Sequence, residues 1–320
     1  MHVRKMTLLS AGAACIALSS LAVGVFDQMQ AVAKPDKQAQ LVAQQQNSLT
    51  VVFPSRSDST DLQTKANAVA AFLSKEIGMP VQAQIGDDTA AVEALRANRA
   101  DVAFLSSRPA LKAEQLANAR LYLAEVRSNY SGKYTYNSVF VVPKNSPLQT
   151  RNSAKATLEQ LRGKKMAFTS PTSGSGFIFP VGELVRQGLV PSRDRLEGFF
   201  GQVSYGGNYA KALQAVLRNQ AEVAAVSEYA LSTPYITEAE KSQLRVLHKI
   251  SGVPAHGVAI DDDVPAPMRE KIVNALLKLN QKENNQLLRD LYNSTELVKV
   301  DHNRHLAPVR DALKLAGIDP

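Results

Sequence analysis

The segment at residues 169–177, TSPTSGSGF, combines hydroxyl side chains and two glycines in a way that suits anion binding. It follows a predicted strand at residues 165–168 and precedes an apolar segment with helical spacing. Hydroxyl groups can donate to an oxyanion. The first N–H groups of a helix lack intrahelical acceptors and lie at the positive end of its dipole. An ordinary helix cap in a Gly/Ser-rich loop explains the same composition, so both interpretations stay open.

Two enzymatic interpretations of this segment fail on spacing. No Gly-Lys-Ser/Thr follows at the distance that a P-loop requires. The residues around Ser175 read SGSGF, which departs from the Gly-x-Ser-x-Gly frame of a nucleophile elbow. Because no His or Cys lies near the candidate serines and no paired acid and base accompanies them, we predict a binding protein that is not an enzyme and uses no cofactor.

A second set of candidates lies in loops that follow two other predicted strands. Arg56 comes after the strand at residues 49–53, and Arg108 after the strand at residues 101–105. Both loops lie at carboxyl ends of strands, where α/β proteins place ligands, and guanidinium groups bind anions bidentately. The alternative is that each arginine points to solvent. Ser106 and Ser107 are short neighbours that could complete this half of a site.

Beyond residue 49, short β-branched runs alternate with segments of helical spacing, which predicts an α/β fold with mainly parallel sheets. The polar residues behind Pro143 favour a crossing between two lobes. Lobe 1 would comprise residues 49–143 and 253–320, and lobe 2 would comprise residues 144–252. Two crossover strands then form a hinge, around which the lobes close on a ligand. Tyr136 approaches this crossing and could pack beside the ligand, but structural packing is the favoured interpretation.

The N-terminus has the pattern of a secretory signal peptide. A basic start leads into a mostly apolar run at residues 6–26, and Ala31 and Ala33 provide the small residues that signal peptidase accepts. Cleavage near Ala33 would remove residues 1–33 during export to the periplasm, and a retained membrane anchor is the alternative. Cys15 lies within this run, which continues well past it, so lipidation is disfavoured. Residues 34–48, rich in Gln and Ala, are expected to form a flexible tether.

The net charge of +8 raises nucleic acid as a possible partner. The basic residues are scattered, however, with no basic run beside stacking aromatics and no Trp, so we expect no nucleic-acid binding. A basic exterior that attracts small anions explains the charge. His302 and His305 lie near Asp301 but lack a third convincing ligand, which favours a solvated surface over a metal site.

Four segments together resemble the periplasmic binding proteins of phosphonate, phosphite and phosphate importers. In that family a strand ends in Asp-Pro-x-Ser-Thr-Ser-Gly-aromatic-aliphatic-x-Pro, and this chain has SPTSGSGFIFP at residues 170–180. The other matches are ALRANRADVAFL at residues 94–105, LRGKKMAF at residues 161–168 and AVLRNQAEVAAV at residues 215–226. Their order and spacing extend the resemblance over roughly residues 49–318.

The resemblance implies ligand-binding roles for residues in lobe 2. Ser173 and Ser175 would offer hydroxyls, beside the N–H groups of Gly174, Ser175 and Gly176; Gly174 stands where the family has Thr. Tyr209, after Asn208, takes the position of a family His, and a phenol can donate to an oxyanion but cannot supply a titratable cation near neutral pH. The family's acidic residue falls on Ser227, with Glu228 beside it.

The resemblance implies a two-lobed periplasmic-binding-protein fold of type II and a solute-binding protein that captures a phosphorus oxyanion for an ABC importer. The expected partners are the ligand and the importer permease, with the protein itself a monomer. A periplasmic sensor that presents its bound form to a membrane kinase is the alternative. If Arg56 and Arg108 both face the cleft, they favour a fully ionised or carboxylate-bearing anion over a phosphonate with a neutral tail.

Overall fold

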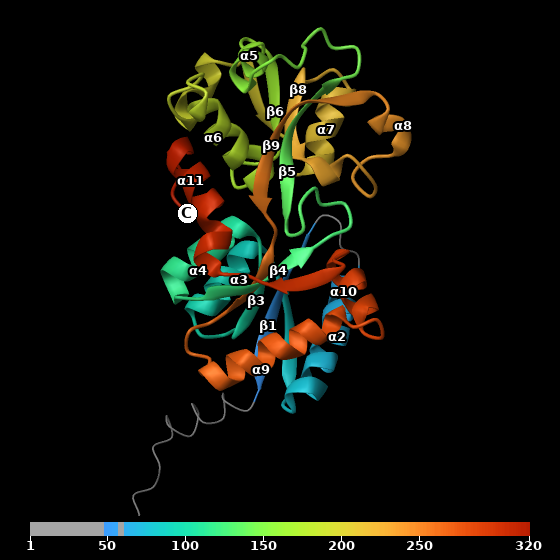
Figure 1. The fold of residues 1–320 in the computed structure, drawn as a ribbon, viewed down its shortest axis with the longest axis vertical. Coiled ribbons are helices and arrows are strands. Elements are labelled where there is room, and N and C mark those ends of the chain that lie inside the picture. The colour runs from blue at the N-terminus through green and yellow to red at the C-terminus, as the bar shows by residue number, and fades with distance from the viewer. Residues whose placement is uncertain (1–47, 57–60) are drawn as a thin grey trace, which may run out of the picture. The chain divides into compact units, whose positions relative to one another are not determined.

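The computed structural model describes residues 48–56 and 61–320. The predicted signal peptide and nearly all of the predicted tether lie outside these residues. Among the helices of the described residues, none is long and apolar enough to cross a membrane. The described chain forms two β-sheets with helices packed around them (Figure 1).

The first sheet is six-stranded and has the order β11-β4-β10-β3-β1-β2. β1 runs parallel to β2 and β3, whereas β10 and β11 run antiparallel to their neighbours. All four residues of β3 and of β10 are buried, as expected for strands covered on both faces. The strands are β1 (Leu49–Pro54), β2 (Val81–Gly86), β3 (Val102–Leu105), β4 (Arg120–Val126), β10 (Gly257–Ile260) and β11 (Glu296–Lys299).

The second sheet is five-stranded and has the order β7-β6-β8-β5-β9. β6 runs parallel to β7 and β8, whereas β5 runs antiparallel to β8 and β9. The α/β class is confirmed, but both sheets are mixed, where we predicted mainly parallel pairing. The strands are β5 (Thr135–Pro143), β6 (Lys165–Phe168), β7 (Gln202–Tyr205), β8 (Val223–Ser227) and β9 (Leu244–Pro254).

The helices follow the apolar spacing of the sequence. α2 buries Leu62, Ala66, Val69, Leu73 and Ile77 and ends at Gly78, whose φ of 72° is the left-handed conformation that favours glycine. The longer helices are α2 (Leu62–Ile77), α3 (Asp88–Arg96), α4 (Ser107–Ala117), α6 (Phe179–Arg186), α7 (Tyr209–Leu217), α9 (Ala266–Leu277), α10 (Asn285–Tyr292) and α11 (His302–Ala316). The shorter ones are α5 (Ala154–Glu159), η1 (Gly174–Ile178), η2 (Arg193–Gly198), η3 (Glu228–Ala230), α8 (Glu238–Lys241) and η4 (Lys278–Asn280).

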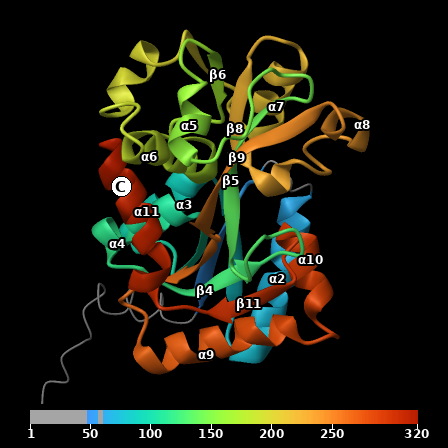
Figure 2. The ribbon, with the colours of Figure 1, turned by 45° about the horizontal axis from the view of Figure 1, so that its top comes forward.

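The chain passes from the first sheet to the second between β4 and β5 and returns between β9 and β10 (Figure 2). We placed the first crossing behind Pro143. The structure instead pairs β5 with β8 and β9 from Thr135 onward, so the crossing precedes this strand. An apolar run such as residues 139–142 suits a central strand of either sheet, which is why its sequence does not reveal the partner strands.

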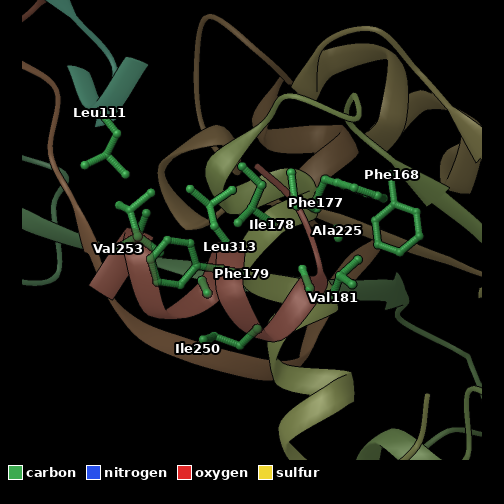
Figure 3. Close-up of a cluster of buried hydrophobic side chains, with 14 of the residues drawn as sticks. Leu111, Phe168, Phe177, Ile178, Phe179, Val181, Ala225, Ile250, Val253 and Leu313 are labelled. Carbon is green, nitrogen blue, oxygen red and sulfur yellow. The ribbon is translucent and has the colours of Figure 1, made fainter. Parts of the chain in front are cut away.

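Helix α11 packs against α6, β9 and α4, and so contacts elements around both sheets. A Cβ atom built at Gly182 of α6 would lie only 3.2 Å from the Ala312 carbonyl oxygen, so the two helices approach closely. Leu313 of α11 shares an apolar cluster with Phe179 of α6 and Val253 of β9 (Figure 3). We assigned this helix to lobe 1 alone, but its core contacts extend to the helices of the second sheet.

Candidate anion-binding cleft

A cleft of about 280 Å³ is lined by residues from both sheets. Most of these residues follow the carboxyl ends of strands, the place where open α/β sheets bind ligands. The first sheet and its helices contribute Arg56, Asp88, Ser106, Ser107, Arg108, Arg127 and His256. The second sheet and its helices contribute Tyr136, Thr169, Ser170, Thr172, Ser173, Gly174, Gly207, Asn208, Tyr209, Tyr229 and Tyr235.

Arg56 reaches the cleft after β1, but its guanidinium fork is held by a buried carboxylate. Nη1 and Nη2 donate to the two oxygens of Glu125 at 3.0 and 2.8 Å, and the guanidinium stacks 3.6 Å from the centre of the Tyr292 ring. Ser294 donates a further hydrogen bond to Glu125 at 2.8 Å. We considered Arg56 as a bidentate anion ligand or a solvated side chain. In the structure its bidentate partner is Glu125.

Arg127 is a second guanidinium beside the Glu125 carboxylate. Its Nη2 lies 3.7 Å from Glu125, so two guanidinium groups surround one carboxylate. Burial raises the pKa of Glu125, but Arg56 and Arg127 outweigh burial and bring it to about 2. The carboxylate is therefore ionised near neutral pH. Two guanidinium groups therefore lie beside one ionised carboxylate at the cleft.

His256 lies beside this cluster, in the short connection between β9 and β10. Burial, followed by repulsion from Arg56, lowers its pKa to about 3, so the imidazole is neutral near neutral pH. Its buried Nδ1 has no hydrogen-bond partner among the described residues. A neutral imidazole nitrogen can donate or accept a hydrogen bond, depending on the tautomer.

The start of α4 forms another part of the first-sheet side. Ser106 precedes the helix and donates its hydroxyl to Asp88 at 2.6 Å, while Ser107 is the first helical residue and is buried. The Arg108 side chain donates to the carbonyl oxygen of Asp319 at 2.9 Å and also lines the cleft. Burial, followed by repulsion from Arg193, lowers the pKa of Arg108 below its ordinary value.

On the second-sheet side, the TSPTSGSGF segment folds into a loop and a single π-helical turn, η1. Ser173 caps the turn, because its Oγ accepts the N–H of Gly176 at 3.0 Å. The Ser173 hydroxyl proton remains available to a ligand, whereas the Gly176 N–H is used within the turn. Gly174 and Ser175 are the first residues of η1, where N–H groups have no intrahelical acceptor.

Ser175 and Gly176 support the loop from beneath the cleft and do not line it. Ser175 is fully buried, and its Oγ lies 2.8 Å from the Tyr209 hydroxyl oxygen, which positions that phenol at the cleft. A Cβ atom at Gly176 would fall 2.1 Å from Oγ1 of Thr169, so only glycine fits there. Thr169 in turn donates to the Ala225 carbonyl oxygen at 3.0 Å, which ties the loop to β8.

Asn208 and Tyr209 begin α7 at the same side of the cleft. The Asn208 side chain caps the helix by accepting the N–H of Lys211 at 2.9 Å. The starts of α4, η1 and α7 thus all lie at the cleft. Helix starts present unpaired N–H groups and the positive end of the backbone dipole, which favours an anion between them.

A cluster of tyrosine rings closes the second-sheet side, and we call it the tyrosine cluster. Its ring centres lie 5.1 to 5.9 Å apart. Arg127 lies 5.6 Å from the Tyr229 ring centre and 5.9 Å from that of Tyr130, within the range of cation–π contacts. Tyr136 therefore has both the packing role and the position at the cleft that we considered. The cluster consists of Tyr130, Tyr136, Tyr209, Tyr229 and Tyr235.

Ser227 and Glu228, which the resemblance suggested as ligand residues, do not line the cleft. Ser227 is fully buried at the end of β8. Glu228 binds Asn137 at 2.7 Å and pairs with Lys249. The carboxylate that does line the cleft is Asp88, at the start of α3.

Asp88, Arg127 and His256 line the cleft but were not predicted from the sequence. Asp88 follows β2 at the start of a helix, which is the same signal that identified Arg56 and Ser106. Arg127 follows β4, a strand that we did not predict, and His256 lies in a two-residue connection without a motif.

Within the described residues, no group of three or more His, Cys, Asp or Glu side chains could hold a metal ion.

Two known proteins have sequences related to this chain. The chain is 26% identical to the phosphonates-binding periplasmic protein of Escherichia coli over 204 residues, 62% of this chain and 56% of that protein. It is 24% identical to the phosphate-import protein PhnD of Mycolicibacterium smegmatis over 216 residues, 67% of this chain and 63% of that protein. The aligned regions thus span less than two thirds of either relative.

A solved structure shares the fold. A binding protein of Prochlorococcus marinus in complex with methylphosphonate superposes with a TM-score of 0.66 at 19% identity, over 84% of this chain and 97% of that one. The family model described as the periplasmic substrate-binding protein of a phosphonate ABC transporter matches residues 51–306. Because this match covers more than half of the chain, the chain belongs to the family of periplasmic substrate-binding proteins of phosphonate ABC transporters.

Proposed function

We propose that the chain captures a phosphorus oxyanion, in the form of phosphate, phosphite or a phosphonate, and delivers it to the permease of an ABC importer. The observation that carries this proposal is the convergence of three helix starts on one cleft, at Ser107, Gly174 and Tyr209. Arg56 and Arg127 support it as well, because both line the cleft and guanidinium groups there favour an anionic ligand. The names of the two sequence relatives, one a phosphonate binder and one a phosphate importer, agree with this ligand class.

Capture proceeds by closure of the two sheets and their helices around the anion. Ser173 and the first N–H groups of η1 bind it from one side, and the start of α4 with Ser107 and Arg108 binds it from the other. Charge-assisted hydrogen bonds replace those that the anion makes with water. The protein acts as a monomer and catalyses no reaction.

Export is part of the same proposal. Residues 1–33 act as a signal peptide that is cleaved near Ala33, and the folded chain works in the periplasm. N-terminal sequencing of the protein recovered from a periplasmic extract tests this step. A mature chain that begins near residue 34 supports cleavage, and an intact N-terminus contradicts it.

A matched pair of serine variants tests the binding role of the loop. Ser173 and Ser153 both cap a helical turn by accepting an N–H three residues later, at 3.0 and 3.1 Å, but only Ser173 lines the cleft. Calorimetric titration with phosphate and methylphosphonate should show that Ser173→Ala weakens binding about 10- to 100-fold, the effect of one hydrogen bond to a charged group. Ser153→Ala should lose its helix cap without a change in affinity. Equal affinities for the two variants would contradict the proposed site.

A further inference from the structure

A second cavity opens beside the anion-binding cleft. Its volume is about 320 Å³, and it lies along α3 and α4, with Thr172 and Pro320 at its other walls. The two cavities share the side chains of Asp88, Ser106, Arg108 and Thr172. The two cavities are therefore neighbours, and we call these four shared residues their junction.

The second cavity differs from the cleft in chemistry. Val92, Pro109 and Leu116 give it an apolar wall, with Glu93 and Lys112 beside them. Leu116 is 40% exposed and is one of the few large apolar side chains of the described residues that lie open to solvent. An apolar wall offers nothing to a bare oxyanion, but it favours burial of a carbon substituent.

Asp88 sets the polarity of the junction. Its Oδ2 accepts the Ser106 hydroxyl at 2.6 Å, and its Oδ1 lies 3.4 Å from the Ser106 nitrogen. A carboxylate at this point repels ionised oxygen atoms of a ligand. The same carboxylate attracts a ligand that brings a hydrogen-bond donor to this point.

The sizes of the cavities agree with an extended ligand. The second cavity, at about 320 Å³, is comparable in volume to the cleft, at about 280 Å³. A bare oxyanion or methylphosphonate in the cleft would leave the second cavity without a ligand group.

Building on the proposed function, we propose that the preferred ligand is a phosphonate or phosphate monoester whose organic substituent enters the second cavity and directs a hydroxyl or amine to Asp88. The oxyanion itself stays at the starts of α4, η1 and α7. Asp88 is then the residue that determines specificity for the substituent, in place of Glu228, whose carboxylate binds Asn137 and Lys249.

Calorimetric titration of the full chain with matched ligands tests this inference. We expect 2-aminoethylphosphonate, 2-hydroxyethylphosphonate or glycerol 3-phosphate to bind at least about tenfold more tightly than propylphosphonate, which lacks a donor, and than phosphate. The first two ligands distinguish an amine from a hydroxyl. Equal or tighter binding of phosphate would overturn the inference while leaving the proposed function intact. Absence of binding by every phosphorus compound would contradict the proposed function itself.

Two variants test whether the organic substituent binds in the second cavity beside Asp88. Thr89 lines only the second cavity and is exposed, so Thr89→Trp should narrow that cavity and reduce the affinity ratio of glycerol 3-phosphate to phosphate at least about tenfold. The same substitution at Thr64, an exposed residue of α2, should leave this ratio unchanged.

Asp88→Asn should reduce the preference for 2-aminoethylphosphonate over propylphosphonate. An unchanged ratio in Thr89→Trp and an unchanged preference in Asp88→Asn would place the substituent elsewhere and overturn the inference.

Discussion

Ser107 and Gly174 face each other across the cleft, and a Cβ atom at Gly174 would lie 3.9 Å from the Ser107 Oγ. Ser107 begins α4 beside the first sheet, and Gly174 begins η1 beside the second. The absence of a side chain at Gly174 keeps the space between these two helix starts open for a ligand. Gly174 brings no hydroxyl to the cleft, whereas Ser173 directly before it lines the cleft.

A large side chain at Gly174 should therefore block the cleft. Gly174→Leu fills the space opposite Ser107 and is expected to weaken phosphate or phosphonate binding at least about tenfold in calorimetric titrations. Gly198→Leu is the control, because a Cβ atom there meets nothing within 4 Å. Unchanged affinity in Gly174→Leu would show that the ligand does not lie between these helix starts.

A methyl group at Gly176 should destabilise the loop. In Gly176→Ala the new Cβ would lie 2.1 Å from Oγ1 of Thr169 and 2.3 Å from its Cβ, so the loop must shift. We expect a loss of about 1–3 kcal/mol in the free energy of unfolding, as for other overpacked sites. Urea unfolding measures it, and Gly198→Ala should change stability far less. Equal midpoints for the two variants would contradict the packing described for η1.

The buried ion pair should be important for stability. Arg56→Ala leaves Glu125 buried with only Arg127 to balance its charge, and loss of one partner of a buried pair costs about 3–5 kcal/mol. Lys241→Ala removes an exposed pair with Glu238 and should cost less than about 1 kcal/mol. Thermal or urea unfolding compares the two. Similar small losses would mean that Arg56 does not compensate the Glu125 charge.

Stability should fall as the pH drops below about 6.5, in part because of His256. Its pKa is about 3 in the folded protein and 6.5 ordinarily, so the unfolded chain takes up a proton that the folded chain does not. The free energy of unfolding then decreases with falling pH between these values by about 1.4 kcal/mol per pH unit for this proton. The lowered pKa values of His248, His302 and His305 act in the same direction.

His256→Gln isolates this contribution. Urea unfolding near pH 6 and near pH 5 gives the change in the free energy of unfolding with pH. In the variant this change should be smaller than in the wild type by the contribution of about one proton. A change in stability that is the same at both pH values does not affect this comparison, because only the slope of the free energy of unfolding against pH is compared. An identical slope in the variant would mean that His256 ionises normally in the folded protein.

Local sequence patterns predicted the parts of the fold and site that depend on neighbouring residues. The spacing of Leu62 to Ile77 predicted α2 and its end at Gly78, and the hydroxyl-rich segment before Phe177 predicted a helix start at the cleft. In both cases, a side-chain periodicity or a capping group acts within a few residues.

Such patterns do not predict contacts between residues that lie far apart in the sequence. Nothing in the loop after β1 indicates that Glu125, 69 positions later, holds the Arg56 fork. The run at residues 139–142 indicates a buried strand but not the sheet to which it belongs. Ser227 was carried over by alignment with the family, and its burial depends on the packing around β8, which only the fold shows.

The capture of a phosphorus oxyanion is best tested by calorimetric titration of the full chain with phosphate, phosphite, methylphosphonate and 2-aminoethylphosphonate, with sulfate for comparison. We expect saturable binding of at least one of the phosphorus compounds at one site per chain, weakened by Ser173→Ala and not by Ser153→Ala. Absence of binding by all four phosphorus compounds would contradict it.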